Sequence, residues 1–243
     1  GVLRFGLYES IRAFAAEKME ASDGDGGALL GTGAAAMEAL RRRHSAHFSE
    51  LGASAALART PGPGGLQFHT ELRREHENVW AAFHAAVAQG ERVSATHCAL
   101  GLAVIVGIQG PIQTGSDVLA VVAEYDDLAR GLQLEVALRI GMMAAKSGDR
   151  RAARTHWETG LEMCTEEAHP VMYARLLSQV GMVYFTLGEP VKARNYLVSG
   201  LRIARERNDA WLEAQCLAHL ALFLQHHSEM PRAGACYDQA LRL

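Results

Sequence analysis

The residues of this chain that could bind a metal are histidines and cysteines placed one helical turn apart. His44 and His47 have this spacing, with Glu50 one turn further on, and Cys216 and His219 repeat it. Each pair could offer two ligands from one face of a helix, whereas a structural zinc site takes four. Because the sequence contains neither HExxH nor CxxC, we predict no metal site.

Motifs for covalent or cofactor chemistry are equally few. There is no GxSxG, and no GxxxxGK[ST] loop, because none of the three lysines follows a glycine. Residues 31–36 (GTGAAA) fit the weaker GxGxxA fingerprint of dinucleotide binding, but no strand precedes them, and we interpret them as a link between helices. The cysteines lie in predicted helices, where a buried thiol behaves as a small apolar residue. We predict no cofactor and no enzymatic activity.

The composition excludes several classes of partner. The chain has 243 residues, of which 49% are apolar and 21% charged, as in a soluble globular protein. Its formal net charge of -3 gives no general cationic field for nucleic acid or an acidic membrane, and acidic neighbours offset the arginines at 41–43 and 73–74. The longest uncharged apolar run, 98–108, is shorter than the roughly 20 residues that span a bilayer. Four widely spaced cysteines favour a reducing compartment, so we expect a cytoplasmic location. From the charge and the short apolar runs we expect no direct contact with nucleic acid or a membrane.

The first 90 residues are expected to form a small helical region. Alanine and leucine dominate, prolines are few, and strand alternation is nearly absent. The predicted segments are a helix over 8–21, a flexible link over 22–33, a helix over 34–57, a break over 60–65, and a helix over 66–88 that Gly90 closes.

From about residue 92 a unit of about 40 residues repeats. Gly141 and Gly181 are each followed seven residues later by a turn glycine, and Ala221 takes the same place in a third copy. A large residue and then, three positions on, a small one follow at matching places: Trp157, Leu197 and Tyr237, then Gly160, Gly200 and Ala240. A fourth, degraded unit is expected around Gly101, Gly110-Pro111 and Gly115.

This small-then-large pattern is typical of tetratricopeptide repeats, although the unit is longer than the standard 34 residues. A small residue on the first helix of a hairpin lets the second approach, and the large residue fills the space between hairpins. One hairpin cannot bury its own apolar face, so neighbours must stack. We predict an all-α fold, an α-α superhelix or tetratricopeptide-like solenoid preceded by a small helical region.

Three segments of the N-terminal third resemble one family in order. Residues 4–16 (RFGLYESIRAFAA) resemble the end of the winged-helix subdomain in signal-transduction ATPases with numerous domains, the STAND regulators. Residues 40–47 (LRRRHSAH) are similar to the helix that comes next, and 75–82 (EHENVWAA) to a later segment, with Trp80 where arginine is commoner. The resemblance implies an end of a winged-helix-like region with a first helix over 1–21, a helical linker region over 22–90 and repeats over 91–243.

The family includes bacterial transcriptional activators and proteins fused to Ser/Thr kinase or cyclase domains. Its repeat region is similar to a sensor arm that binds an inducer or partner and controls an ATP-driven switch. This chain has no phosphate-binding loop, so the resemblance implies the sensor part of a larger regulator. The implied partners are a protein or peptide, a small inducer, and the ATPase core of the parent chain.

In a tetratricopeptide frame, the concave face is lined by the first helix of each hairpin. Methionine and phenylalanine would give soft apolar contacts, and Arg175 and Lys146 could hold a carboxylate; alternatively, some apolar residues pack against the next hairpin. The predicted partner-binding residues are Glu135, Leu138, Met142, Lys146, Arg175, Ser178, Met182, Phe185, Thr186, Gln215, Leu222, Gln225 and His226.

The sequence leads to two functional hypotheses of different classes. The first is a non-enzymatic sensor module of a bacterial signalling or transcription regulator, binding its ligand through the concave face. The alternative is an oligomerisation scaffold that forms a homo-oligomer through the exposed end of the last hairpin. An enzyme, the third possibility, would need a metal or a His/carboxylate pair within hydrogen-bond reach.

Overall fold

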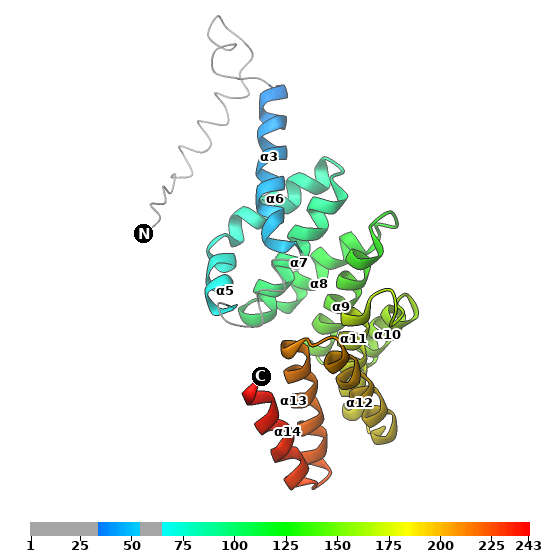
Figure 1. Cartoon of the computed structure of the whole chain (residues 1–243). Helices are drawn as coiled ribbons and strands as arrows, with labels where there is room; N and C mark the ends of the chain where they lie inside the picture. The colour runs from blue at the N-terminus through cyan, green and yellow to red at the C-terminus, as the bar shows by residue number, and fades with distance from the viewer. Residues whose placement is uncertain (1–33, 54–64) are drawn as a thin grey trace, which may run out of the picture.

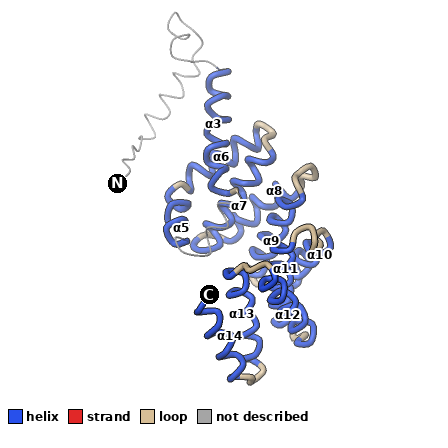
Figure 2. Tube along the Cα trace, in the orientation of Figure 1, coloured by secondary structure: helices blue, strands red, loops and turns tan. Residues whose placement is uncertain are grey.

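The computed structural model describes residues 34–53 and 65–243. The predicted helix over 8–21, the link over 22–33 and the family-like segment 4–16 lie outside the described residues. The described part consists of helices joined by short turns and contains no strand (Figures 1 and 2).

The helices follow one another with few intervening residues. In chain order they are α3 (Ala34–Gly52), α5 (Gly65–Arg74), α6 (His76–Ala88), α7 (Arg92–Gln109), α8 (Ile112–Ala123), α9 (Arg130–Lys146), α10 (Arg150–Glu162), α11 (Pro170–Thr186), α12 (Pro190–Glu206), α13 (Ala210–His226) and α14 (Met230–Arg242).

The helix predicted over 66–88 is wrong in one respect, because the chain forms two helices there. Glu75, with φ -94° and ψ 8°, separates α5 from α6. Its carboxylate accepts a hydrogen bond from the Asn78 side chain at 2.7 Å, and its carbonyl accepts the Val79 N–H at 2.8 Å. The break lets both helices bury their apolar stripes in one core, with Phe68 and Leu72 from α5 joining Val79 from α6.

The predicted superhelix is confirmed by the arrangement of the later helices. Four hairpins, α7/α8, α9/α10, α11/α12 and α13/α14, stack in order (Figure 1). The first helix of each hairpin contacts the first helix of the next hairpin, in the order α7, α9, α11 and α13. The second helices approach each other far less closely. We call the first set the inner helices and the second set the outer helices. The inner helices form the concave side of the curved array, here called the inner face.

The turn glycines within the hairpins adopt the left-handed conformation that the sequence pattern requires. Gly148 has φ 90° and Gly188 has φ 78°. In the third copy Ser228 occupies this position with φ 61°, a backbone conformation that costs a residue with a Cβ about 1–2 kcal/mol. The turn geometry is therefore retained even where the glycine is lost.

The pairing of small and large residues within a hairpin is seen directly at Gly141. A Cβ placed on Gly141 would lie 2.2 Å from Nε1 of Trp157. That indole N–H donates a hydrogen bond to the Leu138 carbonyl at 3.0 Å, in the preceding turn of α9. In the next hairpin a Cβ on Gly181 would lie 2.8 Å from Leu197. The small residues therefore bring the two helices of each hairpin into contact.

The N-terminal helices pack onto the first hairpin. Helix α3 contacts both α6 and α7, and side chains of α5 to α8 share one apolar core. The predicted division at residue 90 stays a prediction. None of the described helices is long and apolar enough to cross a membrane.

Candidate binding surfaces

A row of polar side chains crosses the inner face from one inner helix to the next. Arg175 of α11 donates from Nη1 to Oε1 of Glu135 in α9, at 2.6 Å. These two residues occupy equivalent positions of successive repeats, 40 residues apart. The other Glu135 oxygen, Oε2, is buried without a hydrogen-bond partner. The ion pair thus ties two repeats together and leaves one acceptor unused.

Arg139 lies one turn after Glu135 on α9 and is the most deeply buried cation of the row. Its residue is 9% exposed, and its Nε has no hydrogen-bond partner. Its Nη1 donates to the sulfur of Met142, at 3.9 Å. Burial is the largest effect on the pKa of Arg139 and lowers it. The nearby Glu135 carboxylate raises this pKa, and the positive charge of Arg175 lowers it. Two guanidinium groups therefore share one carboxylate.

The row continues with a serine and a histidine. Ser178 of α11, fully buried, lies with Oγ 2.7 Å from Nδ1 of His219 in α13. Burial lowers the pKa of His219 to about 4, so the ring is neutral near pH 7. Burial also raises the pKa of the neighbouring Cys216 thiol to about 11. Because Ser178 has no exposed surface and Cys216 stays protonated, this group has the properties of a structural contact between repeats.

Aromatic and histidine rings gather at the carboxyl ends of α11 and α13. The ring centroids of Phe185 and His226 lie 5.0 Å apart, and those of Phe185 and Phe223 lie 5.8 Å apart. His227 approaches Phe223 at 4.5 Å. The structure thus brings together two of the predicted partner-binding residues, Phe185 and His226, although they are 41 positions apart in the chain.

The predicted partner-binding residues differ in their access to a ligand. Glu135, Leu138 and Ser178 are buried, and Leu138 belongs to the core between hairpins. The half-buried members are Met142, Arg175, Met182, Phe185 and Gln215, and the exposed ones are Lys146, Thr186, Leu222, Gln225 and His226. The Gln225 side chain accepts a hydrogen bond from Tyr237 of α14 at 3.3 Å.

Sequence reasoning did not place Arg139 or His219 on the inner face, and considered His219 only as a metal ligand. Each lies four residues after a predicted residue of the inner face, Glu135 and Gln215 respectively. Side chains four positions apart share a helix face, so this spacing was the available signal.

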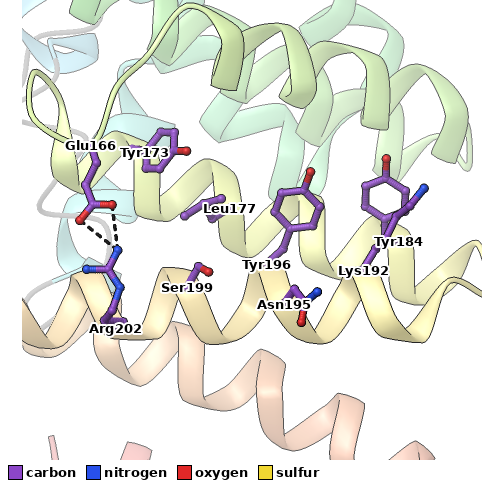
Figure 3. A pocket seen from close by; sticks show the side chains of 9 residues that line it. All are labelled: Glu166, Tyr173, Leu177, Tyr184, Lys192, Asn195, Tyr196, Ser199 and Arg202. Carbon is purple, nitrogen blue, oxygen red and sulfur yellow. Dashed lines mark hydrogen bonds and ion pairs between the residues drawn. The ribbon is translucent and has the colours of Figure 1, made fainter.

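A cavity that the sequence did not suggest opens on the side of the outer helices (Figure 3). It has a volume of about 630 Å³ and lies over α11 and α12. The rings of Tyr184 and Tyr196 stack at 5.6 Å with planes 2° apart, and Lys192 Nζ lies 5.0 Å from the centre of the Tyr184 ring. At the other end Arg202 pairs with Glu166 at 2.8 Å. We call this cavity the outer groove.

A second cavity, of about 470 Å³, lies at the equivalent place over α9 and α10. In this second cavity, Gln133 and His156 occupy the repeat positions that Tyr173 and Tyr196 occupy in the outer groove. The cavity thus recurs with the repeat, whereas the stacked tyrosine pair belongs to the outer groove alone. The signal in the sequence was that three of the six tyrosines, Tyr173, Tyr184 and Tyr196, fall within one unit.

The two pairs first considered as metal ligands are separated in the fold. His44 of α3 borders a third cavity between α3 and α6, and burial, followed by the charge of His47, lowers its pKa. His219 faces Ser178 on the inner face. Within the described ranges no three His, Cys, Asp or Glu residues are placed to hold a metal ion.

These features define a class of protein: an all-α superhelical repeat with a polar row along its inner face. No family model and no curated protein matches the chain. Solved structures do match, among them the crystal structure of BtubC (BKLC) from P. vanneervenii. This structure aligns with 70% of the chain, and the alignment covers 72% of BtubC, with a TM-score of 0.58 and 14% sequence identity. At that identity the likeness shows the fold alone.

Proposed function

We propose that the chain is a non-enzymatic sensor module of a bacterial signalling or transcription regulator, and that it binds a protein, peptide or small inducer on its inner face. The observation that carries this proposal is the set of half-buried apolar side chains beside the polar row. Met142, Met182 and Phe185 lie on successive inner helices and remain partly open to solvent. Methionine and aromatic side chains in such a place give adaptable contact area for a ligand.

The resemblance to STAND regulators supports the regulatory part of the proposal, and a cytoplasmic location goes with it. In such a regulator, ligand binding would shift the ATPase core of the parent chain between two states. Only a difference in ligand affinity between these states can drive the shift. The curved array suits this role because each repeat contacts only its neighbours, so a ligand that spans α9 to α13 can change the relative positions of the repeats.

The test is selection of a displayed random-peptide library against the purified chain. Selected peptides are then measured against the variant Met182→Glu/Phe185→Glu, which places two charges on the inner face. We expect affinity to fall at least about tenfold, because each buried apolar contact contributes about 1–2 kcal/mol and a charge opposes it.

The matched control is Val191→Glu/Val198→Glu on the outer helix α12, where these side chains are 75% and 48% exposed. Peptide affinity should be unchanged in the control. If the control loses binding while the inner-face variant retains it, or if substitution of Tyr196 in the outer groove has the larger effect, the proposal is wrong. Circular dichroism of each variant establishes that it is folded.

An oligomerisation scaffold is the second candidate, and one observation favours it. Helix α14 has exposed apolar side chains: Met230 is 59% and Leu241 86% exposed. The equivalent of Leu241 in the preceding unit, Leu201, is 6% exposed because the next hairpin covers it. The scaffold hypothesis assigns this apolar stripe of α14 to contact with a second copy of the chain.

Light scattering over a concentration series separates the two candidates. A monomeric wild type contradicts the scaffold. Self-association that is lost in Leu241→Glu and retained in Met182→Glu/Phe185→Glu supports it. If self-association is instead lost in Met182→Glu/Phe185→Glu, the result identifies the inner face as the assembly surface.

A further inference from the structure

We propose that the inner face between α9 and α11 holds a carboxylate group of the ligand against Arg139 and Arg175. The proposal rests on the proposed function and specifies the chemistry that the inner face recognises. It starts from the local charge: two guanidinium groups lie around the single carboxylate of Glu135. The cluster therefore has one positive charge in excess.

The burial of Arg139 makes this excess charge costly. An ion that leaves water loses its hydration, and this is unfavourable unless opposite charges and hydrogen bonds replace it. Arg139 is 9% exposed, and its Nε donor has no partner. The Met142 sulfur is a weak acceptor and does not neutralise a cation. A bound anion would supply the missing negative charge and an acceptor for the Arg139 Nε–H.

The size of the excess charge selects the kind of anion. A carboxylate brings one negative charge and two oxygens that match the fork of a guanidinium group. A phosphate monoester brings about 1.5 to 2 negative charges at pH 7, and the Glu135 carboxylate would repel the surplus. Met142 and Met182 lie half-buried one and two turns further along α9 and α11. An aliphatic group next to the carboxylate could pack against them.

The competing explanation is that Arg139, Glu135 and Arg175 form a purely structural cluster. Buried charge clusters of this kind often contribute little, and apolar residues of similar volume replace them without loss of stability. Arg139→Met tests both explanations, because it removes the charge and keeps most of the volume. The matched control is Arg202→Met on the outer helix α12, where Arg202 pairs with Glu166.

The experiment is thermal unfolding of the full chain in sodium butyrate, sodium phosphate and sodium chloride at equal ionic strength. Butyrate at about ten times its dissociation constant should raise the midpoint of the wild type by about 3–6 °C over chloride. The control should show the same rise, and Arg139→Met should show none. Arg175→Met, whose side chain is 29% exposed, is a second variant with the same expected loss and a smaller structural risk.

Three results would overturn the proposal. One is a wild type that butyrate does not stabilise over chloride. Another is an equal butyrate effect in the wild type and in both inner-face variants. The third is phosphate stabilising through Arg139 more strongly than butyrate, which would indicate a site for a dianion.

The source of the carboxylate is distinguished with the selected peptides. Loss of binding on amidation of the peptide terminus identifies a chain end, and loss on Glu→Gln or Asp→Asn identifies a side chain. Butyrate binding without either effect identifies a small organic acid. Suppose that peptides bind the wild type, that their affinity falls in Met182→Glu/Phe185→Glu, and that it is unchanged in Arg139→Met. The carboxylate site is then wrong, while the proposed function stands.

Discussion

Arg175 of α11 reaches across the inner face to Glu135 of α9 from the equivalent position one repeat later, with 2.6 Å between Nη1 and Oε1. The pair is unequal, because the Arg175 side chain is 29% exposed and that of Glu135 is 9% exposed. Glu135 also acts on the charge of Arg139. One carboxylate therefore balances two cations, and its loss should cost more than the loss of either cation.

We expect Glu135→Ala to lower the free energy of unfolding by about 3–5 kcal/mol, because it leaves two guanidinium groups without a counter-ion. Arg175→Ala should cost about 1–2 kcal/mol, since Arg139 remains beside the carboxylate. Urea denaturation of the two variants measures the difference. Equal losses, or a larger loss for Arg175→Ala, would show that Glu135 does not hold the cluster together.

The contact between helices within the α9/α10 hairpin gives a second prediction. Gly141→Ala places a methyl group within 2.2 Å of Trp157 Nε1 and threatens the hydrogen bond from this indole to the Leu138 carbonyl. We expect a loss of about 1–3 kcal/mol, as for overpacking of a tight core.

The matched control for that substitution is Gly131→Ala in the same helix. A Cβ on Gly131 meets nothing within 4 Å, so alanine should be neutral or stabilising by about 0.5–1 kcal/mol. Denaturation midpoints compare the two. If Gly141→Ala is as stable as Gly131→Ala, the hairpin is not limited by the approach of Trp157.

The repeat frame was predictable because it depends on local rules. A glycine with positive φ ends the first helix of a hairpin, and a small residue faces a large one at fixed spacing, so Gly141, Gly148 and Trp157 reveal their roles in the sequence. The break at Glu75 was not predictable, since EHENVWAA has the composition of a continuous helix and packing decides where it ends.

The inner face was predictable only in part. The frame places Glu135 and Arg175 on it, but which side chains pair depends on the distance between successive inner helices. Arg139 and Ser178 show the limit. Their types indicate surface residues, whereas the curvature of the array buries both.

A third prediction concerns the effect of pH on stability. Burial holds the pKa of His219 at about 4, against 6.5 for an ordinary histidine. Between these values the unfolded chain binds a proton that the folded chain does not, so stability falls as the pH is lowered from about 6.5 to about 4 and is unaffected by this group above that window. The loss attributable to His219 should approach about 3 kcal/mol at the acidic end.

His219→Gln keeps a hydrogen-bond acceptor for Ser178 and removes the titration. Urea denaturation of both proteins at several pH values should give a shallower dependence for the variant between pH 6.5 and 4. Burial also lowers the pKa of His44 and His97, so a residual slope is expected. Parallel curves for the two proteins would mean that His219 does not resist protonation in the folded state.

The turn inside each hairpin provides a reciprocal pair of substitutions. Gly188 has φ 78° in the second copy, and Ser228 has φ 61° at the same place in the third. A Cβ on Gly188 would meet nothing within 4 Å, so its effect is confined to the backbone. We expect Gly188→Ser to destabilise by about 1 kcal/mol and Ser228→Gly to stabilise by a similar amount, because only glycine adopts the left-handed conformation without a steric cost.

Thermal unfolding of the two single variants and of the double variant measures both effects, and the double should lie close to the wild type because the two turns are 40 residues apart. A destabilised Ser228→Gly would show instead that the serine side chain contributes to the third turn and that the turns are not equivalent.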